Sequence, residues 1–490
     1  MAEVIPTPDD RNRDWKPLSS SVLRSRNSRK FTHCRPRTVI AAALLVGICL
    51  AGPVLSGEPV DVGGRCELFL DDHLIAKTSG QVSRTLLRPE PKEVVFVADA
   101  PWEGNTSGYY TFFQDGKTYK MIYRGWRHDR KKKQVHPAVT CYAESTDGVK
   151  WTRPALGLHL WKGSKKNNII YTGDPESHNF TPFHDANPAV ARGARYKAVG
   201  GLRGKLFGLV SPDCKTWKRV RQRAILTSGQ FDSQNLVFWD ADRSEYRAYW
   251  RCFRGGVRAI RTATSADFVT WRNEADVSYS KGSSREHLYT NAVQKYFRAP
   301  HIFIGFPTRY DPRSQQVEPI FMTSRDGRTF HRYADPVIPR TVPRNRDRNR
   351  SNYMAWGMVQ LPDKPGEISV YATENYYEPT PGRVRRFVYR LDGFVALRAG
   401  AKGGVVLTKP FRYRGVMLRM NYIVRPNGSL QVDVLDKTGK IIGVSKPLTG
   451  DRPDAEVGWK RNPRLNGGVA QLRLTMTNAD VYSFQFHAKP

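Results

Sequence analysis

The chain has 490 residues, of which 79 are Lys or Arg and 45 are Asp or Glu, so its formal net charge is +34 at pH 7. Hydrophobic residues make up 39% and aromatic residues 11%, which excludes intrinsic disorder for most of the chain. Glycine without a triplet period, the lack of heptads and a total of 6 cysteines exclude collagen-like, coiled-coil and disulfide-dense proteins.

The N-terminal segment has the pattern of an export signal. Residues 1–37 are polar and basic, and residues 38–55 form a long apolar run that ends at small residues near Ser56 and Gly57. This order predicts a signal peptide over residues 1–57 and a protein exported to the periplasm or the cell exterior. An uncleaved membrane anchor is the alternative, although Pro53 shortens the apolar run.

The middle of the chain repeats a heptapeptide of the form Ser-x-Asp-x-x-x-aromatic. The copies lie at residues 145–151, 211–217, 265–271 and 324–330. An alternating apolar run precedes each copy, as in a β-strand, and the Ser and Asp side chains favour a turn. A fifth alternating run lies at residues 367–377. Because units of about 60 residues cannot bury their faces alone, we predict a five-bladed β-propeller over residues 58–398, with an all-β sandwich as the alternative.

The pattern changes near Ala399. Strands joined by Pro-Asn-Gly and Lys-Thr-Gly turns cover residues 407–443, and two more strands cover residues 471–486. They predict a C-terminal β-sandwich over residues 399–490. The predicted fold class is therefore all-β, a five-bladed β-propeller followed by a β-sandwich.

The cysteines carry no metal signature. Four remain after the predicted signal, Cys66, Cys141, Cys214 and Cys252, and none has CxxC or Cys/His spacing. We expect buried thiols, and the sequence leaves a disulfide in an oxidising compartment open.

Carboxylates stand among amides and aromatic residues just before the alternating runs. In a propeller the innermost strands line a central channel, so these residues are expected at its mouth. Such a mixture is typical of carbohydrate sites, in which two carboxyl groups perform acid/base or nucleophilic chemistry. The candidate catalytic residues are Glu103, Asp185, Asp232, Glu286 and Glu374. The alternative for each acid is a strand cap or an arginine partner.

The candidate acids are assigned roles by position. Asp185 would orient the acid or stabilise the transition state, Asp232 or Glu103 would be base or nucleophile, and Glu286 or Glu374 would be the general acid. Carboxyl groups about 5–5.5 Å apart would indicate retention, and about 6.5–9.5 Å inversion. The candidate substrate-binding residues are His184, Asn187, Gln234, Asn235, Tyr289, Asn291, His301 and Arg309.

Several stretches carry a family resemblance. ELFLDDHLI at residues 67–75, PWEGN, FDSQN, YTNAV and VYATE resemble secreted bacterial proteins placed near the five-bladed glycoside hydrolases, the group of invertases, levansucrases and arabinanases. The resemblance covers roughly residues 65–486 and implies a glycosidase with a C-terminal sandwich. Several such enzymes hold a channel Ca²⁺, but no metal-ligand spacing occurs here, so we predict no metal and no cofactor. The invertase motifs are replaced, and only Asp185 keeps a similar Asp-Ala-Asn-Pro setting.

We therefore predict a secreted glycoside hydrolase that acts on an oligo- or polysaccharide. The alternatives are a non-catalytic carbohydrate-binding propeller and a sialidase-like hydrolase, whose Asp boxes are one residue longer. Nucleic acid is not expected as a partner, because the basic residues are spread along the chain and form no recognition motif. The charge predicts either general surface basicity or a cationic surface that concentrates an acidic glycan. The oligomeric state is not predicted.

Overall fold

The computed structural model describes residues 58–131, 133–340 and 352–488, and the predicted signal peptide lies outside these residues. The described chain consists of strands and loops apart from two short 3-10 turns, η1 (Glu176–His178) and η2 (Arg192–Ala194). The predicted all-β class is confirmed. Within these ranges, no helix has the length and apolarity needed to span a membrane.

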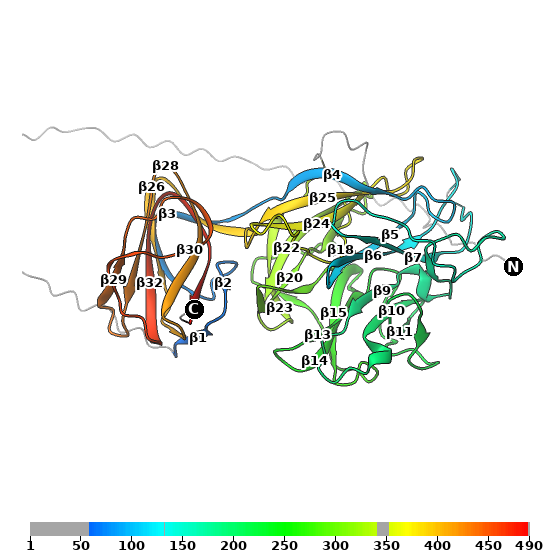
Figure 1. Ribbon diagram of the computed structural model, residues 1–490, viewed down its shortest axis with the longest axis horizontal. Coiled ribbons are helices and arrows are strands. Elements are labelled where there is room, and N and C mark those ends of the chain that lie inside the picture. Colours follow the sequence, from blue (N-terminus) through cyan, green and yellow to red (C-terminus); the bar gives the residue numbers. More distant parts are fainter. Residues whose placement is uncertain (1–57, 132, 341–351, 489–490) are drawn as a thin grey trace, which may run out of the picture. The chain divides into compact units, whose positions relative to one another are not determined.

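Three four-stranded antiparallel sheets follow one another in the chain and have the form of propeller blades (Figure 1). The first sheet consists of β5 (Gly108–Asp115), β6 (Thr118–Gly125), β7 (Val139–Ser145) and β8 (Ile169–Tyr171). The second consists of β9 (Thr181–His184), β10 (Tyr196–Leu202), β11 (Lys205–Ser211) and β12 (Lys218–Arg219). The third consists of β13 (Leu236–Asp240), β14 (Glu245–Arg254), β15 (Val257–Ser265) and β16 (Arg272–Asp276).

Two further small sheets continue the series. The fourth has seven strands: β17 (Ser278–Tyr279), β18 (His287–Leu288), β19 (Gln294–Tyr296), β20 (Ala299–Gly305), β21 (Thr308–Tyr310), β22 (Val317–Ser324) and β23 (Thr329–Pro336). The fifth has three, in the order β24 (Glu367–Glu374), β25 (Arg383–Arg390) and β4 (Glu90–Val97). The predicted propeller is thus confirmed as a series of propeller-like blades, four of which have four or more strands.

The Ser-x-Asp heptapeptides form the predicted turns. After β7, the backbone N–H groups of Val149 and Lys150 each donate to the Asp147 carboxylate at 2.8 Å. The same bonds recur at Asp213, Asp267 and Asp326. The aromatic residue that closes each copy packs onto a neighbouring ring, as where Trp151 lies edge-on to Phe112 at 5.2 Å. Each turn therefore fixes the outer end of one sheet and supplies a ring to the core.

The C-terminal region forms one curved, half-barrel sheet of ten strands. Its longest strands are β26 (Val395–Thr408), β28 (Met417–Leu435) and β32 (Gly468–His487). Register shifts interrupt the pairing of β28 with β32, and such irregularities bend a sheet. The bent sheet encloses its own apolar core. The alternating strands from which a sandwich was predicted therefore belong to one sheet and not to two. Its shorter C-terminal strands are β27 (Phe411–Tyr413), β29 (Ile441–Ser445), β30 (Gly450–Glu456) and β31 (Trp459–Arg461).

Three strands from the start of the described chain belong to this ten-stranded sheet. They are β1 (Val60–Gly63), which pairs with β27, β2 (Glu67–Leu68), which pairs with β32, and β3 (Ile75–Leu86), which pairs with β26. The predicted propeller segment began at residue 58 and included all three. Alternation along a strand reveals which face is buried but not which strand is its partner, so the sequence pattern could not assign these strands.

Candidate functional site

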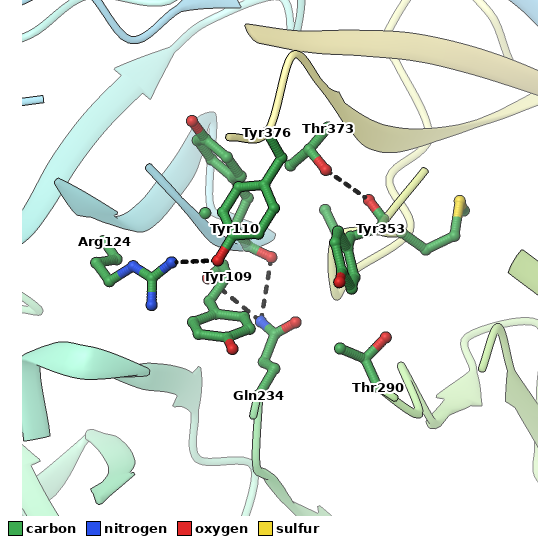
Figure 2. Close-up of a pocket in the computed structure, with 11 residues that line it drawn as sticks. Tyr109, Tyr110, Arg124, Gln234, Thr290, Tyr353, Thr373 and Tyr376 are labelled. Carbon is green, nitrogen blue, oxygen red and sulfur yellow. Dashed lines mark hydrogen bonds between the residues drawn. The ribbon is translucent and has the colours of Figure 1, made fainter. Parts of the chain in front are cut away.

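A narrow cavity is lined by residues from four of the five small sheets (Figure 2). Its free volume is about 10 Å³, which is room for about one water molecule. Tyrosine side chains fill the remaining space. The lining residues are Gly108, Tyr109, Tyr110, Arg124, Gln234, Thr290, Tyr353, Met354, Ala355, Thr373 and Tyr376.

Five tyrosines around this cavity are only half-buried, and we call them the tyrosine cluster: Tyr109, Tyr289, Tyr353, Tyr376 and Tyr377. The ring centroids of Tyr353 and Tyr376 are 5.4 Å apart, those of Tyr376 and Tyr377 are 4.7 Å apart, and those of Tyr289 and Tyr353 are 5.6 Å apart. The cluster is therefore a partly exposed aromatic surface beside the cavity.

Tyr109 reaches the cluster through an irregular backbone. Its φ is +53°, in the left-handed region, and the pairing of β5 with β6 shifts register between Gly108 and Thr111. The Tyr109 hydroxyl donates to the backbone carbonyl of Asp232 at 3.1 Å. The amide of Gln234 donates to the carbonyl of Tyr110 at 3.2 Å (Figure 2). Polar contacts thus tie the first sheet to the loop before β13.

Arg124 lies beneath the cluster and is buried. Its guanidinium donates to the Tyr376 hydroxyl and to the carbonyl of Thr106, both at 2.8 Å. The same group lies 4.6 Å from the ring centroid of Tyr109. The cation is therefore held by carbonyl, hydroxyl and aromatic groups, and these contacts leave its positive charge uncompensated.

Arg251, on β14, is the second cation at this site, and 4% of its side chain is exposed. One of its terminal nitrogens donates to the Asp232 carboxylate, and the guanidinium lies 4.7 Å from the Tyr289 ring centroid. Its Nε and Nη1 are buried and have no hydrogen-bond partner among the residues that the structure describes. Two donors of this cation are therefore unsatisfied.

His178 borders both cations. Burial, and then the charges of Arg124 and Arg251, lower its pKa to about 3. The ring is therefore neutral at pH 7. It lies edge-on to Trp126, with ring centroids 5.4 Å apart.

Three of the predicted catalytic acids are buried against basic partners. Glu103 accepts from the guanidinium of Arg153 at 2.9 Å, and Asp185 binds the ammonium of Lys197. Glu374 accepts from two arginines, Arg383 at 2.6 Å and Arg385 at 2.7 Å. The side chains of these three acids are at most 1% exposed, so each is a buried ion pair.

The other two predicted acids are partly exposed. Glu286 accepts from Arg309 at 3.0 Å, on the fourth sheet. Asp232 has 45% of its side chain exposed and, through Arg251, lies beside the tyrosine cluster. The five acids each bind a different cation. Their catalytic roles stay predictions, and Asp232 is the acid that the fold places at the candidate site.

Two of the eight predicted substrate-binding residues, Gln234 and Tyr289, lie at this site. The others hold local structure or pair elsewhere, as where Arg309 joins Glu286 to Glu318. The remaining five contacts are Asn187 with Tyr246, Asn235 with the Phe231 carbonyl, Asn291 with the Val293 N–H, His184 with Arg195, and His301 with Glu67.

Sequence reasoning missed Tyr109, Tyr353, Tyr376 and Arg251 as site residues. A usable signal was present, because each of these tyrosines follows Gly or Asn next to a predicted inner strand.

No group of three His, Cys, Asp or Glu side chains suited to a metal ion occurs in the described ranges. The absence of a metal stays a prediction. Cys66, Cys141, Cys214 and Cys252 are free and buried, and burial raises the pKa of the Cys252 thiol to about 11.

No family model matches the chain, and no curated protein matches it. One similar solved structure is a family 43 glycoside hydrolase, an arabinoxylan arabinofuranohydrolase from Bacillus subtilis. Its sequence identity to this chain is 10% and its TM-score is 0.38, and the alignment covers 82% of this chain and 99% of that chain. A family 32 beta-fructofuranosidase from Bombyx mori has 8% identity and a TM-score of 0.40, covering 81% and 94%. An N-acetylgalactosamine deacetylase from F. plautii has 12% identity and a TM-score of 0.42, covering 79% and 95%.

Glycoside hydrolases are thus among the similar structures, as the sequence resemblance predicts. Because these identities are below 25% and the TM-scores below 0.5, the likenesses carry no argument about function.

Proposed function

We propose that the chain binds a carbohydrate at the tyrosine cluster. The observation that carries this proposal is the half-buried aromatic surface formed by five tyrosines, with Arg124 and Arg251 beside it. Tyrosine offers an apolar face and a polar hydroxyl on one side chain, which suits the apolar faces and hydroxyl groups of a sugar ring. The two arginines favour a sugar that carries a negative charge.

Hydrolysis of a glycoside is the second candidate, and Asp232 favours it. This carboxylate is half-exposed next to the cluster, where it can accept a proton as a general base. A paired-carboxylate mechanism needs a second acid, and the other four predicted acids are each held in an ion pair. A tyrosine nucleophile, as in sialidases, is the other route. Burial raises the pKa of Tyr109 well above its usual value, which disfavours its phenolate form.

The binding proposal is tested by titrating the full chain with a panel of neutral, uronate and sulfated oligosaccharides. The Tyr376→Ala variant is expected to weaken binding at least tenfold. Tyr171→Ala, at a half-buried tyrosine of β8, is the matched control and is expected to bind like the wild type. Equal affinities in both variants, or no bound member of the panel, would refute the proposal.

Turnover separates the two candidates. If the chain is a hydrolase, Asp232→Asn abolishes release of reducing sugar while binding is retained. If no member of the panel is turned over by the wild type, the binding function stands alone.

We further propose that the fifth sheet is a fifth blade. Met354 and Val359 form single bridges to Ala372 and Ser369 of β24, which supports an irregular inner edge over residues 352–361. We also propose that residues 1–57 direct export and are removed. The N-terminal sequence of the mature protein tests this, and a mature chain that begins at Met1 would contradict it.

A further inference from the structure

A wide groove lies beside the third and fourth sheets, and we call it the arginine groove. Its free volume is about 650 Å³, within the range of about 300–1,000 Å³ that small-molecule sites occupy. The central cavity, at about 10 Å³, is far smaller. The groove is lined by four arginines, Arg254, Arg258, Arg285 and Arg332, and by Glu286, Tyr279, four serines and five small or apolar residues.

The charges of the groove are not balanced. Four arginines line it against one glutamate, Glu286, which already binds Arg309 from outside the groove. Arg285 donates to the carbonyl of Gly255, and the Arg254 carbonyl lies 3.3 Å from the same guanidinium. Within the part of the chain that the structure describes, neither Arg254 nor Arg285 forms an ion pair with a carboxylate.

Two polar groups of the groove lack partners. In the residues that the structure describes, Nε of Arg258 and the Tyr279 hydroxyl are buried without a hydrogen-bond partner, whereas the Glu286 carboxylate is ion-paired. Arg332, with 3% of its side chain exposed, lies 3.6 Å from that carboxylate and over the Tyr279 ring at 4.6 Å. Buried polar groups are usually hydrogen-bonded, so unpartnered ones beside an open volume indicate a site for a polar ligand.

The rim of the groove carries an aromatic ring. Phe253 is 46% exposed, which is unusual for a large apolar side chain, and its ring centroid lies 5.5 Å from the Arg258 guanidinium. Arg258 also lies 5.3 Å from the ring centroid of Tyr289, which belongs to the tyrosine cluster. One arginine therefore contacts both the tyrosine cluster and the groove.

We propose that the arginine groove binds the carboxylate or sulfate groups of an acidic glycan whose end rests on the tyrosine cluster. This inference rests on the proposed function and deepens it by naming the substrate class. Guanidinium groups bind such oxyanions through paired N–H donors, serine hydroxyls supply further hydrogen bonds, and Phe253 offers a face for a sugar ring.

The test uses the full chain and a double variant, Arg254→Ala with Arg285→Ala. Both residues are exposed, so their replacement spares the core. The matched control is Arg192→Ala with Arg412→Ala, which removes the same charge from exposed arginines elsewhere. Calorimetric titrations use an oligogalacturonate, a sulfated galactan oligosaccharide and a neutral galactan oligosaccharide, each at 50 and 300 mM NaCl.

The groove variant is expected to lose at least tenfold in affinity for one acidic oligosaccharide, and the control less than twofold. Affinity of the wild type falls at the higher salt concentration, because screening weakens exposed charge pairs. The oligosaccharide that shows the larger loss identifies the charged group as carboxylate or sulfate. Equal losses in both double variants, or wild-type affinity in the groove variant, overturn the proposal.

Two further arms separate this proposal from others. If Tyr376→Ala binds like the wild type and the groove variant loses affinity, the proposal for the tyrosine cluster is refuted and the proposal for the groove is kept. If Tyr376→Ala loses affinity and the groove variant binds like the wild type, only the proposal for the groove is refuted. If a single-stranded RNA of equal charge binds as tightly as the acidic oligosaccharide and loses affinity equally in the groove variant, the glycan assignment is overturned.

Discussion

Asp185 offers a direct test of whether a predicted catalytic acid is instead structural. Its carboxylate is buried, binds Lys197, accepts from the Tyr246 hydroxyl at 2.7 Å and accepts from the Asn187 N–H at 3.0 Å. Lys197 is itself only 9% exposed in its side chain. In Asp185→Asn the ammonium loses its counter-charge while it stays buried, and breaking such a pair costs about 3–5 kcal/mol.

The asparagine can still accept from Tyr246, so we expect the low end of this range, about 3 kcal/mol. At about 2 °C per kcal/mol for a large domain, the melting temperature falls by roughly 6 °C. Adding Lys197→Met removes the unpaired charge and restores most of the loss, because an uncharged side chain of similar length tolerates burial. The control is Asp72→Asn, whose exposed pair with Arg84 contributes about 0–1 kcal/mol.

Thermal unfolding followed by circular dichroism measures all four proteins. A structural role requires the loss in Asp185→Asn and its recovery in the double variant. An Asp185→Asn protein that melts with the wild type but loses all glycoside turnover would refute this reasoning and return Asp185 to the catalytic set.

Three other predictions follow from the described contacts. The pKa of His178 is about 3 in the folded chain and about 6.5 in the unfolded chain, so between these values only the unfolded state takes up a proton. The free energy of unfolding therefore falls by about 1 kcal/mol per pH unit below pH 6.5. In urea unfolding measured between pH 6.5 and 4, the His178→Gln variant is expected to lose this pH dependence. Asp267→Ala removes two backbone hydrogen bonds from its turn and lowers the free energy of unfolding by about 1 kcal/mol, whereas an unchanged urea midpoint would show that the turn needs no side chain. A thiol reagent in native buffer is expected to leave the four buried cysteines unmodified, and the same reagent in denaturant is expected to modify all four. Peptide mass spectrometry checks this for Cys66, Cys141, Cys214 and Cys252.

The fold was more predictable from sequence than the site. Alternating strands and the Ser-x-Asp turns are local patterns, and the structure keeps them where the sequence has them. The bend of the C-terminal sheet arises from bulges in β28 and β32, and bulges leave little trace in alternation. Partner choice for β1, β2 and β3 depends on contacts with the far end of the chain, which alternation does not encode.

The candidate site was missed for a related reason. Acids near inner strands were sought because carboxylates perform glycosidic chemistry, but in a chain so rich in arginine and lysine most of them bind a cation. Glu103 and Glu374 illustrate this, since both are buried in ion pairs. Tyr376, just after β24, and Arg124, on β6, come from different sheets, so neither local pattern contains their contact.

The pairing of β4 with β25 governs the order in which the molecule can be completed. Residues 90–97 leave the ribosome early, but their partner β25 is synthesised almost three hundred residues later. Strands β1, β2 and β3 likewise cannot pair until β26, β27 and β32 have been synthesised. Contacts so distant in sequence raise the contact order and slow folding. Until the last strand emerges, the early strands expose unpaired edges, so the nascent chain is held in a state open to aggregation or to chaperones. A shortened chain that ends before β25 leaves both sheets unfinished.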